Sequence, residues 1–72
     1  MKKIEISKEP VELYKILKFE GLAASGAEAK LVIAEGRVSL NGAVETQKRK
    51  KVVSGDVLEF NGEKFTIIFG SE

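Results

Sequence analysis

The sequence of 72 residues contains neither cysteine nor histidine. Without cysteine there are no disulfides and no thiol chemistry, and without either residue type the usual zinc sites are excluded. The absence of histidine also removes the commonest side chain for acid–base catalysis. No nucleophile–base pair or carboxylate cluster takes its place. The sequence therefore predicts a protein that is not an enzyme and that uses no metal, no cofactor and no small-molecule substrate.

Long apolar runs are absent as well. No stretch approaches the roughly 20 apolar residues that span a bilayer. The N-terminal Met-Lys-Lys, followed by alternating Ile4 and Ile6, lacks the apolar segment of a signal peptide. We therefore expect a soluble, cytoplasmic protein with no membrane partner. A chain of this length predicts one domain over residues 1–72, with a modest core worth roughly 3–5 kcal/mol of stability.

Charge is unevenly distributed along a chain whose net charge is only +1. Residues 1–36 are balanced, with six lysines and six glutamates, and residues 52–72 carry a net charge of −3. The basic zone between them consists of Arg37, Lys48, Arg49, Lys50 and Lys51 against Glu45 alone. A local basic zone on a balanced domain indicates a polyanionic partner on one face. A solvated surface turn is the alternative interpretation.

The N-terminal part of the chain predicts a strand and then a helix. Alternation over Lys2 to Ile6 is typical of a short strand. A helix is expected from about Pro10 to Glu20, because proline is tolerated in a first turn and apolar residues then recur at helical spacing. Gly21 should end this helix. The apolar positions are Leu13, Ile16 and Leu17, widened by Val11, Tyr14 and Phe19.

The stretch from Ser25 to Gly42 predicts a second helix, a sharp turn and a strand. Ser25 can cap a helix from Ala27 to Glu35 that ends at Gly36. Alternating residues up to Asn41-Gly42, a strong hairpin signal, then indicate a half-buried strand. The expected core residues are Ala29, Val32, Ile33, Val38 and Leu40.

The rest of the chain predicts a small, mostly antiparallel sheet. A brief strand-like return is expected over Ala43 to Thr46, and strands over Val57 to Phe60 and Lys64 to Phe69. Asp56 should organise the turn before the strand over Val57 to Phe60. Because neither element can bury its apolar side alone, the helices should cover one face of the sheet. The predicted fold is α+β, with two short packed helices against this sheet.

Several segments of this pattern together resemble a known family. They are Leu13 to Leu17, Gly21 to Ala23, Ser25 to Lys30, Gly36 to Gly42 and Gly55 to Leu58. These segments resemble the S-four RNA-binding domain, named after ribosomal small-subunit protein four and also called the alpha-L motif. The likeness runs from about Leu13 to Phe60. With a strand added at each end and Glu45 to Arg49 in place, the chain also resembles stand-alone bacterial YbcJ-type proteins.

The resemblance implies a non-enzymatic module that binds structured RNA, such as ribosomal or transfer RNA. In the family, the two helices and the following strand form one surface that meets the RNA. Cations on that surface neutralise phosphates, and helix N–H groups can approach them. We expect the chain to act as a monomer. The candidate RNA-binding residues are Lys15, Lys18, Ser25, Gly26, Lys30, Arg37, Lys48, Arg49, Lys50 and Lys51.

The helices depart from the family pattern. The family often has arginine at the position of Glu12 and aspartate at that of Tyr14. It also often has polar or basic residues at the positions of Gly26 or Ala27, Leu31 and Ala34. The basic run from Gln47 to Lys51 is expected to compensate. Ser25 can simply cap its helix. Tyr14 and Phe19 could stack on bases if exposed, but we expect both to pack between helix and sheet.

Two other functions fit the same sequence. One is a protein–protein adaptor that docks on a larger assembly through the same surface or through an open sheet edge. The other is a fragment of an enzyme, because the domain is often appended to enzymes that modify RNA or charge transfer RNA. No catalytic module accompanies the domain here, so RNA binding is the prediction that we carry forward.

Overall fold

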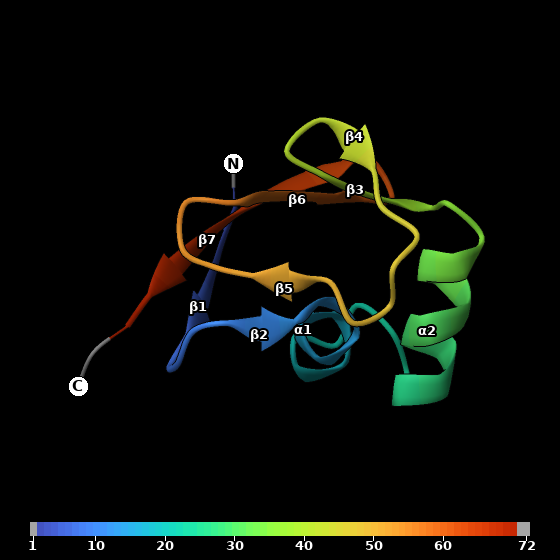
Figure 1. The fold of residues 1–72 in the computed structure, drawn as a ribbon, viewed down its shortest axis with the longest axis horizontal. Coiled ribbons are helices and arrows are strands. Elements are labelled where there is room, and N and C mark those ends of the chain that lie inside the picture. The colour runs from blue at the N-terminus through green and yellow to red at the C-terminus, as the bar shows by residue number, and fades with distance from the viewer. Residues whose placement is uncertain (1, 71–72) are drawn as a thin grey trace.

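The structure is a computed structural model that describes residues 2–70. Two helices lie beside a twisted sheet (Figure 1), so the predicted α+β class is confirmed. In chain order the elements are β1 (Lys2–Ile6), β2 (Val11–Glu12), α1 (Leu13–Phe19), α2 (Gly26–Ala34), β3 (Val38–Leu40), β4 (Ala43–Val44), β5 (Lys51–Val52), β6 (Val57–Phe60) and β7 (Glu63–Phe69).

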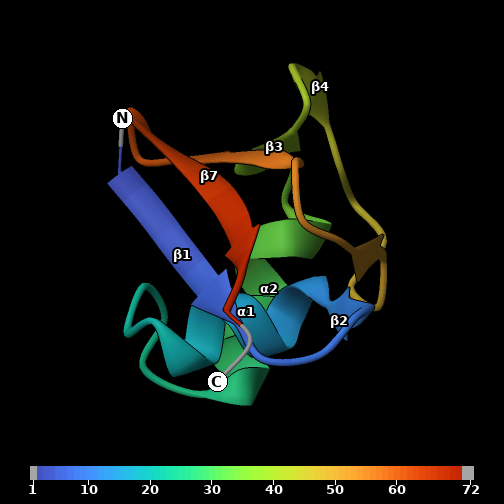
Figure 2. The same ribbon diagram turned by 90° about the vertical axis from the view of Figure 1, so that its left-hand side faces the viewer.

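The main sheet has five strands in the order β1-β7-β6-β3-β4. Strand β1 pairs with β7 in parallel, and the other three pairings are antiparallel, so the expected, mostly antiparallel sheet is confirmed. Figure 2 shows β1 beside β7 at the border of this sheet, where, among residues 2–70, β7 is the one strand hydrogen-bonded to β1. A separate two-stranded sheet of β2 and β5 was not predicted.

The first helix begins later than the sequence pattern predicted. Val11 and Glu12, expected inside a helix starting near Pro10, instead pair with β5. The next two N–H groups, of Leu13 and Tyr14, donate to carbonyls in the basic run at 2.9 and 3.1 Å. The first N–H groups of a helix have no partner within it. Because a distant segment supplies those partners here, α1 starts at Leu13.

The second helix lies within one residue of its predicted bounds. The Ser25 hydroxyl oxygen accepts a hydrogen bond from the Glu28 N–H at 3.2 Å, so the predicted cap is confirmed. The Glu28 carboxylate in turn accepts from the Ala24 N–H at 3.3 Å, which closes the same turn from the other side. Neither helix in residues 2–70 has the length and apolar character needed to cross a bilayer.

The hydrophobic core lies between the helices and one face of the main sheet. Strand residues at alternate positions are buried, and the positions between them are exposed or half-buried. The helices therefore cover one face, as predicted. The buried side chains of the helices are Leu13, Ile16, Leu17, Ala29, Val32 and Ile33, and those of the main sheet are Ile4, Ile6, Val38, Leu40, Leu58, Phe60, Phe65 and Ile67.

Side-chain hydrogen bonds join the turn that follows β3 to the turn that precedes β6. The Asn41 amide donates to Asp56 at 3.0 Å, and its oxygen accepts from the Val57 N–H at 2.8 Å. The second Asp56 oxygen accepts from the Val53 N–H at 3.0 Å. The predicted role of Asp56 in its turn is thus confirmed.

A second tie connects the segment between β1 and β2 to the turn before β6. The Glu9 carboxylate accepts a hydrogen bond from the Ser54 N–H at 2.7 Å. Hydrogen bonds from the Ser54 side chain and then from its N–H lower the pKa of Glu9 below the usual 4.5. Because this contact favours the ionised carboxylate, it anchors the β1–β2 connection at neutral pH.

Candidate nucleic-acid interface

Side chains from three parts of the chain meet around the ring of Tyr14, on α1. The Lys30 ammonium, from the middle of α2, lies 4.7 Å from the ring centre. The Arg49 guanidinium, from residues 45–50 between β4 and β5, lies 5.3 Å from it. Cations are attracted to the face of an aromatic ring. The structure therefore brings two predicted site residues together, and we call Tyr14, Lys30 and Arg49 the Tyr14 cluster.

The backbone on either side of Arg49 is fixed to the start of α1. The carbonyls of Lys48 and Lys50 accept the hydrogen bonds from Tyr14 and Leu13 described above. The predicted basic run is thus attached to the helix rather than hanging free. The side chains of Lys48, Lys50 and Lys51 are exposed beside it and form no ion pair within residues 2–70.

A carboxylate lies among these cations. One oxygen of Glu12 is 3.2 Å from the Arg49 guanidinium and 3.6 Å from the Lys15 ammonium. The spacing of Glu12 and Lys15 along the helix start is a signal that sequence reasoning could have used. Arg49 lies 37 positions further on, so no local pattern indicates its contact with Glu12. Sequence reasoning treated Glu12 only as a departure from the family.

Lys18 and Gly26 lie next to the cluster. A Cβ atom at Gly26 would be 3.9 Å from both the Lys18 side chain and the Tyr14 ring. The start of α2 therefore packs close to α1 at this point. The Ser25 hydroxyl, also predicted to meet RNA, is engaged by the Glu28 N–H, and the nearby Glu28 carboxylate makes this helix start less attractive to phosphate.

Arg37 is not part of the cluster. It follows the C-terminal end of α2, seven positions after Lys30, and its guanidinium lies 3.7 Å from the Glu35 carboxylate. Since a helix rises about 1.5 Å per residue, the remaining turn of α2 separates Arg37 from Lys30. The structure thus gathers Lys15, Lys18, Gly26, Lys30 and Arg49 on one side and leaves Arg37 at the far end of α2.

The prediction for Phe19 was wrong. Its side chain was expected to pack between helix and sheet, but it is 69% exposed. A helix turns about 100° per residue, which places Phe19 beside the stripe of Leu13, Ile16 and Leu17 rather than on it. Tyr14 lies on the opposite flank of that stripe, where it is half-buried against the core. Lys15 and Lys18 point outward between the two aromatic residues.

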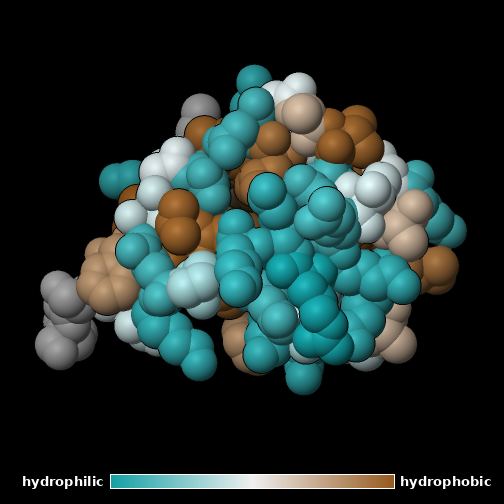
Figure 3. All heavy atoms as spheres, viewed as in Figure 1, coloured by the Kyte–Doolittle hydropathy of each residue, from teal (hydrophilic) through white to brown (hydrophobic). Residues whose placement is uncertain are grey.

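One face of the molecule carries a hydrophilic area that is bordered by apolar side chains. Figure 3 shows hydrophilic side chains gathered over α1, β5 and the segment between β4 and β5. This is the region that holds the basic run and its contacts with α1. The arrangement can attract a polyanion, because several cations lie together on a surface with a hydrogen-bonded backbone beneath it.

Known proteins share this sequence and fold. The S4 domain family model matches residues 4–68. The YbcJ protein of Escherichia coli (strain K12) is 46% identical over 69 residues, which cover 94% of this chain and 99% of that protein. The predicted family likeness is thereby confirmed.

Two solved structures resemble the fold closely. The solution structure of E. coli YbcJ, which reveals an alfaL motif involved in RNA binding, superposes with a TM-score of 0.70 over 94% of this chain and 87% of that one. The crystal structure of the 30S ribosomal protein S4e from Thermoplasma acidophilum gives a TM-score of 0.73 at 28% identity, over 89% of this chain and 34% of that one.

Proposed function

Because the chain belongs to the S4 domain family, we propose that it binds structured RNA, such as ribosomal or transfer RNA, mainly through phosphates. The observation that carries this proposal is the convergence of Lys30 and Arg49 on the ring of Tyr14. Two segments distant in sequence thereby present cations side by side. The alfaL motif described for YbcJ, a relative of 46% identity, supports the same role.

The proposed surface extends from the Tyr14 cluster in two directions. Lys15 and Lys18 continue it along the outward side of α1, and Lys48, Lys50 and Lys51 continue it along the basic run. Lysine and arginine bind phosphates with release of counterions, so affinity should fall steeply with salt. Ser25 and Gly26 border the surface where α2 approaches α1, and Arg37 would be a separate contact beyond α2.

Glu12 does not prevent such binding. Its pairs with Arg49 and Lys15 are exposed to solvent, and exposed pairs of this kind contribute only about 0.2–1 kcal/mol. A phosphate that reaches Arg49 would replace one weak partner with a more highly charged one. Glu12 thus leaves both cations accessible to a phosphate. We also propose that the chain acts by binding alone, as a monomer and without a cofactor.

The test compares two double variants with the same change in net charge. Lys30→Glu with Arg49→Glu reverses the Tyr14 cluster, whereas Lys3→Glu with Lys64→Glu reverses two exposed cations of β1 and β7. Bulk transfer RNA and total ribosomal RNA are the probes, in filter binding at several salt concentrations. We expect the cluster variant to lose at least about tenfold in affinity. The slope of log affinity against log salt concentration should become shallower by about one for each lost phosphate contact.

The control variant should bind almost as the wild type does. A third variant, with Lys48, Arg49 and Lys50 all changed to glutamate, should abolish retention of RNA on the filter. Undiminished binding by the cluster variant and by this triple variant would contradict the proposal.

A protein–protein adaptor is the second candidate, and the open edge of β1 favours it. An unpaired strand edge can accept an extended segment of another protein. Salt separates the two functions, because binding through backbone hydrogen bonds and apolar side chains lacks the steep salt dependence of phosphate contacts.

A further inference from the structure

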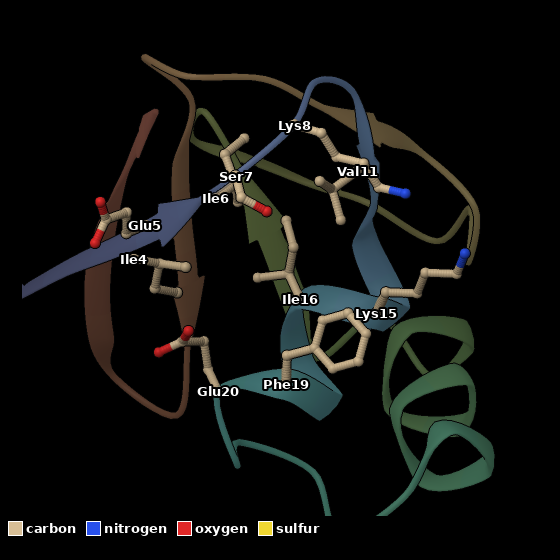
Figure 4. Close-up of a pocket in the computed structure, with 10 residues that line it drawn as sticks. All are labelled: Ile4, Glu5, Ile6, Ser7, Lys8, Val11, Lys15, Ile16, Phe19 and Glu20. Carbon is tan, nitrogen blue, oxygen red and sulfur yellow. The ribbon is translucent and has the colours of Figure 1, made fainter. Parts of the chain in front are cut away.

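A cleft of about 230 Å³ lies between β1 and α1, outside the Tyr14 cluster (Figure 4). Ile4, Ile6, Val11 and Ile16 contribute apolar atoms to its walls, and Phe19 lies at its opening. Phe19 is the most exposed of the large hydrophobic residues in the described part of the chain. An exposed aromatic ring beside an apolar cleft is a suitable platform for another flat ring.

The polar groups of the cleft divide by charge. Figure 4 shows Lys8 and Lys15 at one end and the carboxylates of Glu5 and Glu20 at the other, with the apolar residues between them. Neither Lys8 nor Glu20 forms an ion pair with any residue in the range 2–70. Both charges are therefore available to an occupant, which should be anionic at one end and donate hydrogen bonds at the other.

The cleft is continuous with the proposed phosphate surface. Around α1, the outward side chains follow the order Tyr14, Lys18, Lys15 and Phe19, because successive residues are about 100° apart. The Lys18 ammonium lies 5.8 Å from the centre of the Phe19 ring, and its stem lies near Gly26. Lys18 and Lys15 thus lie between the Tyr14 cluster and the cleft on the outward side of α1.

We propose that an unpaired guanine base of the bound RNA occupies this cleft and stacks on Phe19. Its phosphate would lie toward Lys15 and Lys8, and its Watson–Crick edge toward Glu20. This inference rests on the proposed function, because it concerns the same RNA. It adds a base-reading contact to a surface that otherwise contacts phosphates.

The chemistry of the two ends favours a base, and guanine among the bases. An ionised carboxylate only accepts hydrogen bonds, so the Glu5 and Glu20 end repels phosphate and attracts N–H groups. Guanine presents two adjacent donors, N1–H and N2–H₂, which match the two oxygens of one carboxylate. Uracil presents a single N–H between two carbonyls. The cleft is smaller than the roughly 300 Å³ or more of sites for drug-sized ligands, which suits a single ring system.

The experiment uses the full chain and RNA hairpins that differ only in one bulged nucleotide. The bulge is guanosine, inosine or uridine, and a fully paired hairpin of the same length is the reference. Inosine keeps N1–H but lacks the N2 amino group, so it tests the carboxylate contact alone. Dissociation constants come from fluorescence anisotropy at one salt concentration for the wild type and the Phe19→Ser, Phe19→Tyr, Phe69→Ser and Glu20→Gln variants.

We expect the wild type to prefer the guanosine bulge over the uridine bulge, with inosine between them. Phe19→Ser should weaken binding of the guanosine bulge by roughly tenfold, the usual effect of losing a base–aromatic stack, and leave the paired hairpin unchanged. Phe19→Tyr keeps the ring and should bind as the wild type does. Phe69→Ser removes another exposed phenylalanine, on β7, and should change nothing. Glu20→Gln should reduce the difference between guanosine and inosine.

Two results overturn the inference, and they differ from failure of the proposed function. A wild type that binds no RNA contradicts the proposed function itself. Equal affinities for all hairpins, with no effect of Phe19→Ser, overturn only the base contact. NMR gives the second check: saturation with the guanosine-bulge hairpin should shift the signals of Phe19 and Ile16. Unchanged signals would overturn the base contact.

Discussion

At the scale of single residues, Tyr14 has a role that its sequence context does not indicate. A tyrosine flanking an apolar helical stripe was expected to pack against the core, and part of its ring does so. Lys30 and Arg49, which come from different segments, also lie against the ring. Helical spacing predicts which side of α1 Tyr14 occupies. It cannot predict the two cations, because their positions depend on the packing of α2 and on the basic run.

This role of Tyr14 can be tested by keeping or removing the ring. Tyr14→Phe preserves the aromatic face, so RNA affinity should stay near that of the wild type. Tyr14→Leu removes the attraction for both cations and should weaken binding of bulk transfer RNA by roughly fivefold, equivalent to about 1 kcal/mol. The measurement is filter binding, with thermal unfolding of each variant as the control for folding. Equal affinities of the two variants would show that the ring does not position the cations.

At the scale of elements, the two hairpin turns show how local sequence and tertiary contact combine. Asn41-Gly42 and Asn61-Gly62 were both recognised as turn signals, and both asparagines have φ of +54°. The glycines that follow also have positive φ, as a type I′ turn requires. Local chemistry therefore predicts both turns. Within residues 2–70, the Asn41 side chain also bonds to Asp56 and to the Val57 N–H, whereas the Asn61 side chain forms no such bond.

These two asparagines form a matched pair for measuring that tertiary contact. Asn41→Ala and Asn61→Ala both place alanine at the same left-handed backbone angle, so this penalty is common to both variants. Asn41→Ala also removes two hydrogen bonds across the turn. It should therefore destabilise the protein by about 1–3 kcal/mol more than Asn61→Ala does, as measured by urea unfolding. Equal losses would mean that the Asn41 side chain adds nothing beyond turn geometry.

The boundaries of the elements reveal where local patterns fail. The predicted strand over Lys2–Ile6 and the predicted capped helix after Ser25 depend on neighbouring residues, and both are confirmed. The start of α1 was wrong, and the sheet of β2 and β5 was missed, because both depend on a segment almost 40 positions away in the chain. That same docking brings Arg49 to Tyr14. The error in the helix and the gap in the predicted site therefore have one physical cause.

At the scale of the whole molecule, the terminal strands are part of the core. The sequence motifs of the family extend only from about Leu13 to Phe60. On that basis β1 and β7 were interpreted as strands added to the family domain. In the structure, Ile4 and Ile6 of β1 are buried together with Phe65 and Ile67 of β7. The parallel pairing of β1 with β7 joins the two ends of the described chain. Motif residues alone therefore underestimate the unit that must fold before a surface for RNA exists.

The dependence on β1 leads to a prediction about the stability of the whole chain. Ile4 is 2% exposed, and truncating such a residue to alanine typically costs about 2–5 kcal/mol. Chains of this size are stable by only about 3–5 kcal/mol. Ile4→Ala should therefore be largely unfolded at physiological temperature and should lose RNA binding, although Ile4 is not a residue of the proposed phosphate surface. Ile4→Val, which should cost about 0.5–1.5 kcal/mol, should remain folded and bind RNA normally. Circular dichroism during heating, combined with filter binding, distinguishes the two variants. A folded Ile4→Ala variant with normal RNA affinity would show that β1 is an accessory strand, and that the central motif folds and binds on its own.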